Sequence, residues 1–251
     1  MARRRRTAGR TALGRLWRWV LGAALGLALL SALAVLSLRW IDPPGSAFMI
    51  EARVASWFDD SRGFTLDQRW VDLERISPNL ALAVVASEDQ KFPEHRGFDV
   101  QAIERAYRMN QHSHRIRGAS TISQQVAKNL FLWSGRSYLR KGLEGWFTLL
   151  EEAFLPKRRI LELYLNIAQF GAGIYGAEAA AQRFFHKPAA RLTRAEAAIL
   201  AAVLPNPLLL HANLPSAFLE RRRAWILAQM RDLGGADMLS EIDAYAGPKP
   251  R

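Results

Sequence analysis

The chain of 251 residues contains no cysteine, which excludes disulfide scaffolds, thiol nucleophiles and thiolate metal sites. It also lacks the sequences GxSxG and HExxH and the Walker phosphate loop, so the hydrolases, zinc peptidases and nucleotide-binding proteins that carry them are not indicated. Half of the residues are apolar and 23% are charged, a balance that excludes a wholly disordered chain. The composition is therefore that of a folded protein with one or two domains.

Acidic residues are absent from the first 38 positions, although seven arginines lie there. These arginines supply seven of the twelve net positive charges, so the strongly basic balance belongs mainly to this tail. A basic tail on an otherwise nearly balanced chain is weak evidence for nucleic-acid binding. We therefore expect no nucleic-acid partner.

Charge of either sign is missing from the twenty residues Trp19 to Leu38. A helix of this length covers about 30 Å, the thickness of the hydrocarbon core of a bilayer. Tryptophans flank the segment and all seven arginines precede it, so the positive-inside rule places the N-terminus in the cytoplasm. A signal peptide cleaved near Ala32-Leu33-Ala34 is the alternative, but the apolar stretch exceeds the usual core of about 7–15 residues. We expect a retained single-pass anchor.

Residues that typically begin helices or form turns recur after residue 76. Ser77-Pro78, Asp99 and the capping-box pairs Thr121/Gln124 and Thr193/Glu196 are helix-start signals, and Gly171-Ala172-Gly173 predicts a tight turn. No alternating strand pattern competes with these helices. The predicted fold class is all-α on a membrane stalk. Its expected parts are a basic tail (1–18), a transmembrane helix (19–38), a connector without sustained periodicity (39–71), a helical domain (72–235) and a C-terminal tail (236–251).

The first candidate site is the acidic segment Glu88-Asp89-Gln90-Lys91-Phe92-Pro93-Glu94-His95-Arg96-Gly97-Phe98-Asp99. Glu88 ends an apolar helix, and a carboxylate beside an apolar wall has a raised pKa, in the range useful for proton transfer. The alternative is that Glu88 and Asp89 are solvated residues at a helix end, and the segment taken alone favours that interpretation.

Two further clusters lie downstream. Thr121, Gln124, Gln125 and Lys128 share one helix face near a helix N-terminus, an arrangement suited to sugar hydroxyls and phosphate, although a solvated stripe is equally compatible. Arg140, Lys141 and Glu144 also converge on one face, as a phosphate pocket with a second carboxylate or as an ordinary ion pair within a helix.

Weaker signals are the two histidines of His112-Ser113-His114 and the aromatic clusters at residues 130–133 and Trp146-Phe147. The histidines have no acid or third histidine close in sequence, so a metal site there is disfavoured. The aromatic clusters fit either contact with a membrane surface or an ordinary core.

Four segments, in order, resemble the motifs of the peptidoglycan glycosyltransferase family, which also forms the glycosyltransferase module of class A penicillin-binding proteins: EDQKFPEHRGFD, GASTISQQVAKNLFL, RKGLE and KRRILELYLN. The resemblance covers about Asp72 to Pro207. Because SxxK and KTG are absent, the chain is similar to the monofunctional form. The resemblance implies a lysozyme-like, two-lobed helical fold at the outer face of the bacterial cytoplasmic membrane.

The resemblance also implies an activity: polymerisation of lipid II into β-1,4-linked glycan, with inversion at the anomeric carbon and release of undecaprenyl pyrophosphate. The implied partners are lipid II, the lipid-linked growing strand, the membrane and proteins of cell division or elongation. Two alternatives stay open, a glycan-cleaving enzyme of lysozyme-like fold and a non-catalytic, membrane-anchored scaffold that binds lipid II.

Residue roles follow from the same resemblance. Glu88 is the expected general base, and Glu144 the second carboxylate, on the pyrophosphate side. The cations expected to neutralise the leaving group are Lys128, Arg136 and Arg140. The residues expected to position substrate or shape the loop are Asp89, Phe92, Ser120, Thr121, Gln124, Gln125 and Asn129, with His95 beside Asp89. No cofactor is required, and a divalent metal (Mg²⁺ or Mn²⁺) at the pyrophosphate is left open. Ala119 and Leu143 depart from the family pattern, and Leu143 puts phosphate contacts at its position in doubt.

Overall fold

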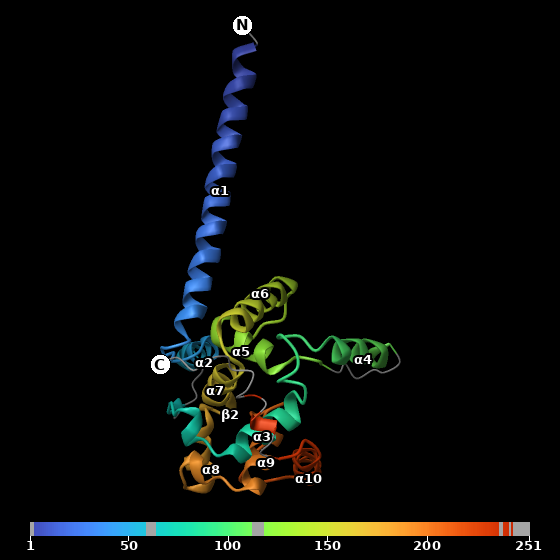
Figure 1. The fold of residues 1–251 in the computed structure, drawn as a ribbon. Coiled ribbons are helices and arrows are strands. Elements are labelled where there is room, and N and C mark those ends of the chain that lie inside the picture. The colour runs from blue at the N-terminus through green and yellow to red at the C-terminus, as the bar shows by residue number, and fades with distance from the viewer. Residues whose placement is uncertain (1–2, 59–63, 112–117, 236–237, 241, 243–251) are drawn as a thin grey trace.

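The computed structural model describes residues 3–58, 64–111, 118–235, 238–240 and 242, and only the backbone of residues 3–13. In these ranges the chain is mainly helical, which confirms the predicted fold class. Helix α1 (Arg3–Ser37) stands out as a long rod, and the other elements pack into a body at its C-terminal end (Figure 1). The tail at 236–251 and the His112/His114 pair fall wholly or largely outside the described residues.

Helix α1 carries the predicted anchor. Gly14–Ser37 is long and apolar enough to cross a membrane, by length and composition, and nearly all of its side chains are exposed. At its C-terminal end Val35 and Leu38 are buried against the body. Arg159 donates to the carbonyl oxygens of Leu38 at 2.7 Å and Ile41 at 3.1 Å, so this end of α1 is fastened to the domain.

The expected connector contains a helix and a strand. Helix α2 (Ala47–Phe58) and strand β1 (Asp67–Gln68) lie where the sequence predicts no sustained periodicity. β1 pairs in parallel with β3 (Ile174–Tyr175), which pairs antiparallel with β2 (Gln169–Gly171). Two or three residues are too few to show alternation, which is why the sequence did not predict these strands.

The turn between β2 and β3 confirms the predicted tight turn and explains one of its glycines. Gly173 has φ +70°, and a Cβ there would lie 2.2 Å from the carbonyl oxygen of Thr65. Only glycine therefore fits where the turn meets the segment that leads into β1.

Helix α3 (Pro78–Glu88) lies at the centre of the core. Every residue from Leu80 to Ala86 is buried, and the helix packs against α9 (Arg194–Val203) and α10 (Ala217–Asp232). The predicted N-cap is confirmed, since the Ser77 hydroxyl accepts from the Asn79 amide at 3.3 Å. The surrounding core holds the C-terminal end of α3, and with it Glu88, at a fixed position.

A second group of helices consists of α5 (Ile122–Phe131), α6 (Tyr138–Phe154) and α7 (Lys157–Ile167), with α5 packed on both others. α6 also contacts α1. The apolar side chains of α6 are divided between core and surface: Leu150 is buried, whereas Leu139 and Trp146 are 70% and 41% exposed. The interpretation of Trp146 as ordinary core is therefore wrong.

The remaining elements complete the body. Helix α4 (Val100–Asn110) projects from it, capped as predicted by Asp99, whose carboxylate accepts from the Ala102 amide at 2.8 Å (Figure 1). Helix α8 (Ala177–Phe185) lies at the end of the body away from the rod of α1 (Figure 1). The 3-10 helix Ala189–Arg191 contacts α8 and the 3-10 helix Leu73–Arg75.

Candidate active site

Glu88 stands at the C-terminal end of α3 and faces a cavity of about 360 Å³. The cavity is walled by the segment after Glu88, by α4 and by the segment that leads into α5, including Ser120 and Thr121. The Glu88 side chain is 15% exposed. Burial raises the pKa of its carboxyl, and a hydrogen bond from Gln125 and the charges of Arg222 and Lys128 oppose that rise. The first predicted carboxylate is thus recessed in a pocket and is not a solvated helix end.

Gln125 on α5 gives Glu88 its closest hydrogen bond. Its Nε2 donates to Glu88 Oε2 at 3.0 Å, and its Oε1 accepts from the Tyr164 hydroxyl at 3.2 Å. On the other side, Arg222 Nη2 lies 3.6 Å from Glu88 Oε1. α5 and α10 thus each place one group at the Glu88 carboxylate, and α7 reaches it only through Gln125.

Asp89 fixes the loop that follows Glu88. Its carboxylate oxygens lie 2.9 and 3.0 Å from His95 Nε2, and Oδ2 accepts from the Ile122 amide at 3.0 Å. A carboxylate at the first amide of α5 satisfies a donor that the helix leaves unpaired. Asp89 therefore joins the acidic segment to the polar helix α5, the loop-shaping place that was predicted for it.

Phe92 is fully buried beneath this loop. The Lys157 ammonium lies 4.5 Å from its ring centre, and the His95 ring meets it edge-on at 6.3 Å. Gly97, with φ +81°, turns the loop where a Cβ would lie 2.6 Å from the Thr148 side chain. These contacts give the loop a single shape.

Thr121 and Gln124 form the predicted capping box at the start of α5. The Thr121 hydroxyl also donates to the Gly97 carbonyl oxygen at 2.6 Å. The Thr121 hydroxyl and the Gln124 side-chain oxygen are thus already bonded within the protein. Ser120 by contrast is exposed on the cavity wall, and the side-chain oxygen of Asn129 is buried without a hydrogen-bond partner among the described residues.

The second carboxylate is held between two cations. Glu144 is 2% exposed, Arg140 Nη1 donates to its Oε2 at 2.7 Å, and Lys141 bonds its Oε1. Lys128 belongs to the same electrostatic cluster: burial lowers its pKa, Glu144 opposes that effect, and Arg140 and Lys141 add to it. Arg136 lies exposed in the segment before α6.

The structure thus brings Glu88 together with Gln125, and Lys128 together with Arg140 and Glu144. The two groups are coupled, because burial lowers the pKa of Lys128 and the negative charge of Glu88, like that of Glu144, opposes this effect. The sequence did not predict Arg222 or Tyr164 as members of the site. Arg222 lies in an arginine run on α10, and Tyr164 lies among the buried residues of α7. Neither has a local pattern that separates it from surface or core, so only the fold could place them.

The described residues of the candidate site do not form a set of ligands for a divalent metal. No group of three histidine, aspartate or glutamate side chains converges among the described residues, and both Glu144 oxygens are occupied by cations. The proposed mechanism therefore assigns no metal ligand.

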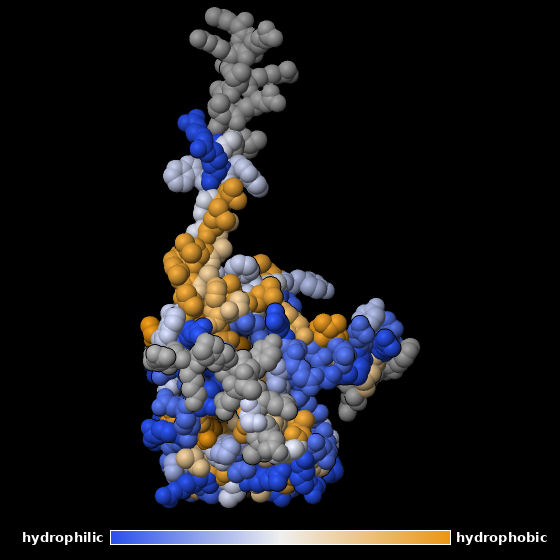
Figure 2. Space-filling view, in the orientation of Figure 1, coloured by the Kyte–Doolittle hydropathy of each residue, from blue (hydrophilic) through white to orange (hydrophobic). Residues whose placement is uncertain are grey.

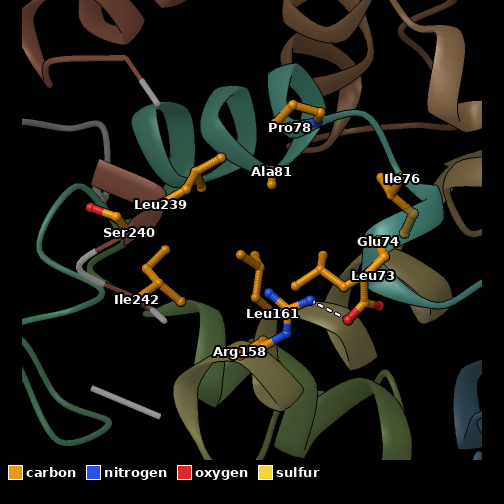
Figure 3. Close-up of a pocket in the computed structure, with 10 residues that line it drawn as sticks. All are labelled: Leu73, Glu74, Ile76, Pro78, Ala81, Arg158, Leu161, Leu239, Ser240 and Ile242. Atoms are coloured by element: carbon orange, nitrogen blue, oxygen red, sulfur yellow. Dashed lines mark hydrogen bonds and ion pairs between the residues drawn. The ribbon is translucent and has the colours of Figure 1, made fainter. Parts of the chain in front are cut away.

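A second pocket, of about 370 Å³, opens near the other end of α3, where Pro78 and Ala81 line it (Figure 3). Ten residues, about 15 Å of helix, separate Pro78 from Glu88. Its walls are mostly apolar, and its two charged groups, Arg158 and Glu74, form an ion pair with each other. The candidate active site is therefore the Glu88 pocket, where polar side chains line the wall and the basic cluster is coupled to Glu88.

A helical body on one apolar rod, with a recessed carboxylate facing a cavity and a basic cluster beside it, defines a membrane-anchored enzyme of lysozyme-like fold. Residues 57–231 match the family model described as Transglycosylase, and the chain belongs to that family.

Relatives named "Biosynthetic peptidoglycan transglycosylase" align over most of the chain. The protein from Xanthomonas campestris pv. campestris (strain B100) is 57% identical over 222 residues, which is 88% of this chain and 90% of the relative. The protein from Pseudomonas syringae pv. syringae (strain B728a) is 53% identical over 227 residues, 90% and 96% of the two chains. That from Citrobacter koseri is 52% identical, over 89% and 96%. The predicted activity class, glycan polymerisation in peptidoglycan synthesis, is confirmed.

Proposed function

We propose that the enzyme polymerises lipid II and that Glu88 is its general base. The acceptor's 4-hydroxyl attacks the anomeric carbon of the lipid-linked growing strand, and its proton passes to the Glu88 carboxylate. The bond from that carbon to the pyrophosphate oxygen breaks, and undecaprenyl pyrophosphate leaves with the bonding electrons. Attack opposite the leaving group inverts the anomeric carbon and gives a β-1,4 linkage. The observation that carries the proposal is the recessed position of Glu88 at a cavity.

The surroundings of the two carboxylates support different roles for them. Glu88 receives one neutral hydrogen bond and has an arginine at 3.6 Å, so it keeps capacity to accept a proton. Glu144 has a cation on each oxygen. We assign Glu144 the task of holding Arg140 and Lys141 in place.

The cluster of Lys128, Arg140 and Lys141 fits the leaving group. Developing negative charge on a pyrophosphate is best stabilised by cations that are already oriented. Arg140 is oriented by Glu144, and the Lys128 ammonium lies 5.4 Å from the ring centre of Phe48 on α2. We propose that these groups, with Arg136 at the edge, bind the donor's pyrophosphate, and that Ser120 and Asn129 contact the sugars.

We further propose that the N-terminal tail is cytoplasmic and that the catalytic domain works at the outer face of the bacterial inner membrane. The seven arginines before the apolar stretch support this orientation. A lipid-linked donor and acceptor must both be reached from the bilayer surface, which the fastened end of α1 keeps close to the domain. Proteins of cell division or elongation are proposed partners on the same side.

The test of the base is Glu88→Gln in the full-length protein, in detergent with labelled lipid II, with products separated by length. We expect long strands from the wild type and a loss of at least about a hundredfold in the variant, since general-base catalysis contributes about 10²–10⁴. Glu94→Gln is the matched control, because Glu94 is a 68% exposed carboxylate in the same loop. It should polymerise normally.

Three results would contradict the proposal in distinct ways. Polymerisation by folded Glu88→Gln at the wild-type rate would remove Glu88 as the base. Shortening of preformed glycan without polymer would favour a cleaving enzyme. Binding of lipid II with no turnover by the wild type would favour a scaffold.

A further inference from the structure

Tyr164 lies behind the Glu88 pocket, on the α7 helix. Its side chain is 1% exposed, and its hydroxyl donates to Gln125 Oε1 at 3.2 Å. The hydroxyl makes no other hydrogen bond to the described residues. It therefore lies one side chain away from the proposed base and cannot touch substrate in the cavity.

The amide of Gln125 has two different ends, and the difference matters at Glu88. Its nitrogen can only donate and its oxygen can only accept. An ionised carboxylate can only accept hydrogen bonds. Gln125 Nε2 can therefore donate a hydrogen bond to Glu88, whereas Gln125 Oε1 would repel the carboxylate. A half-turn of the amide would bring two acceptors face to face and would leave the phenol proton without a partner.

We propose that Tyr164 is a positioning residue that fixes the Gln125 amide so that Nε2 faces Glu88. By donating to Oε1 it selects one of the two amide orientations and keeps a hydrogen bond on the Glu88 carboxylate. This inference rests on the proposed role of Glu88 as general base. Tyr164 would then act on the reaction only through Gln125.

The direction of the effect follows from the groups that face Glu88. Burial raises the pKa of its carboxyl and neighbouring Asp89, itself paired with His95, adds to that rise. The Gln125 bond from α5, Arg222 from α10 and Lys128 from α5 lower it. The uncharged phenol of Tyr164 has its own pKa raised by burial, so it stays a donor through the neutral range. Loss of the Gln125 bond therefore raises the pKa of Glu88.

The experiment is the pH dependence of kcat/KM for labelled lipid II, whose acidic limb reports the pKa of the base in the free enzyme. Tyr164→Phe should move the limb upward by roughly half to one pH unit, as expected when a charge-assisted hydrogen bond is weakened. The alkaline plateau should stay within about threefold of the wild type, because Glu88 is ionised there in either case. A merely structural tyrosine would lower the plateau and leave the limb in place.

Two further variants test the route through Gln125. Gln125→Met removes the amide and should move the limb by about one unit, the size expected for one charge-assisted bond. The double variant Tyr164→Phe/Gln125→Met should match Gln125→Met alone. Tyr175→Phe is the control, since Tyr175 is a buried tyrosine in β3 with no bond to Gln125, and its profile should match the wild type.

Each outcome separates this inference from the proposed function. An unmoved limb in folded Tyr164→Phe, with Glu88→Gln inactive, overturns the positioning role alone. Additive shifts in the double variant do the same. Activity in Glu88→Gln overturns both. If Tyr164→Phe does not fold, Gln125→Met decides: it removes the donor to Glu88 without adding a charge, so an unmoved limb overturns the inference.

Discussion

Among the acidic side chains of α6, Glu151 differs sharply from its neighbours. Glu144 is held by two cations and Glu152 accepts from Lys157 at 2.7 Å, whereas both oxygens of fully buried Glu151 have no hydrogen-bond partner among the described residues. Burial raises the pKa of Glu151 well above its ordinary value of 4.5, and Glu152 adds to the rise. Burial thus favours the protonated form of Glu151, and an unsatisfied polar group remains in the core.

Replacing Glu151 by leucine should stabilise the protein. The change removes a buried polar group of similar volume, which costs about 1–3 kcal/mol when unsatisfied. Burial raises the folded-state pKa of Glu151 above its ordinary value of 4.5. The free energy of unfolding of the wild type is therefore highest below pH 4.5 and declines as the pH rises toward the folded-state pKa. The gain on substitution should thus be larger at pH 8 than at pH 5. Thermal unfolding in detergent at both pH values measures it, at about 2–4 °C per kcal/mol.

Glu151→Gln separates the two parts of this argument. It keeps a polar group and loses the titration, so its unfolding midpoint should depend less on pH than that of the wild type. An unchanged or lower midpoint in Glu151→Leu at pH 8 would mean that the carboxyl has a partner in solution.

At the scale of elements, Arg159 on α7 links the anchor to the domain. Its guanidinium donates to two carbonyl oxygens at the end of α1, pairs with Asp42 at 2.7 Å and bonds Glu162, and it is only 11% exposed. Its planar group also lies 5.3 Å from the ring centre of Trp70. Few other side chains could serve so many acceptors at once, because the fork of donors is specific to arginine.

Arg159→Ala should loosen the end of α1 without unfolding the core. We expect amide hydrogen exchange in residues 38–46 to become at least about tenfold faster, which corresponds to about 1.4 kcal/mol of local stability. Exchange in α3 should stay unchanged. Arg231→Ala, an exposed arginine on α10, is the control. Equal exchange in Arg159→Ala and wild type would show that buried Val35 and Leu38 suffice to fasten α1.

The elements also show where sequence reasoning succeeds. Helix starts were predicted because capping uses local residues: Ser77, Asp99 and Thr121 all accept the expected amide hydrogen bonds. The motifs predicted where the candidate site lies, but they did not predict which of its residues are structural and which face the cavity. Lys157, in the fourth motif, is buried and bonds Glu152, so it supports the scaffold, and no local signal distinguishes it from a substrate-binding lysine. Arg222 reaches Glu88 only because α10 folds back over α3.

At the scale of the whole molecule, α1 and α6 are in contact, and we propose that together they set the depth of the domain in the membrane. Trp146 Nε1 donates to the Ser31 hydroxyl at 3.0 Å, and Ser31 lies six residues inside the apolar span, about 9 Å along the helix. The hydrophobic surface continues from α1 onto the adjoining part of the body (Figure 2). Leu139 and Leu149 of α6 are 70% and 56% exposed. We therefore expect α6 to contact the membrane surface with its exposed apolar side chains, while Arg140 and Glu144 of the same helix lie at the proposed site.

This depth can be measured directly because the chain has no cysteine that would compete for a label. A fluorophore on Leu149→Cys, in vesicles, should be quenched by spin labels on the lipid chains and should emit at shorter wavelength than in water. Arg183→Cys is the control, since Arg183 is exposed on α8, at the end of the body away from the rod of α1 (Figure 1). It should be quenched only by soluble quenchers. Equal behaviour of the two labels would mean that α6 stands clear of the bilayer, and the donor's pyrophosphate would then have to rise out of the headgroup layer to reach Lys128 and Arg140.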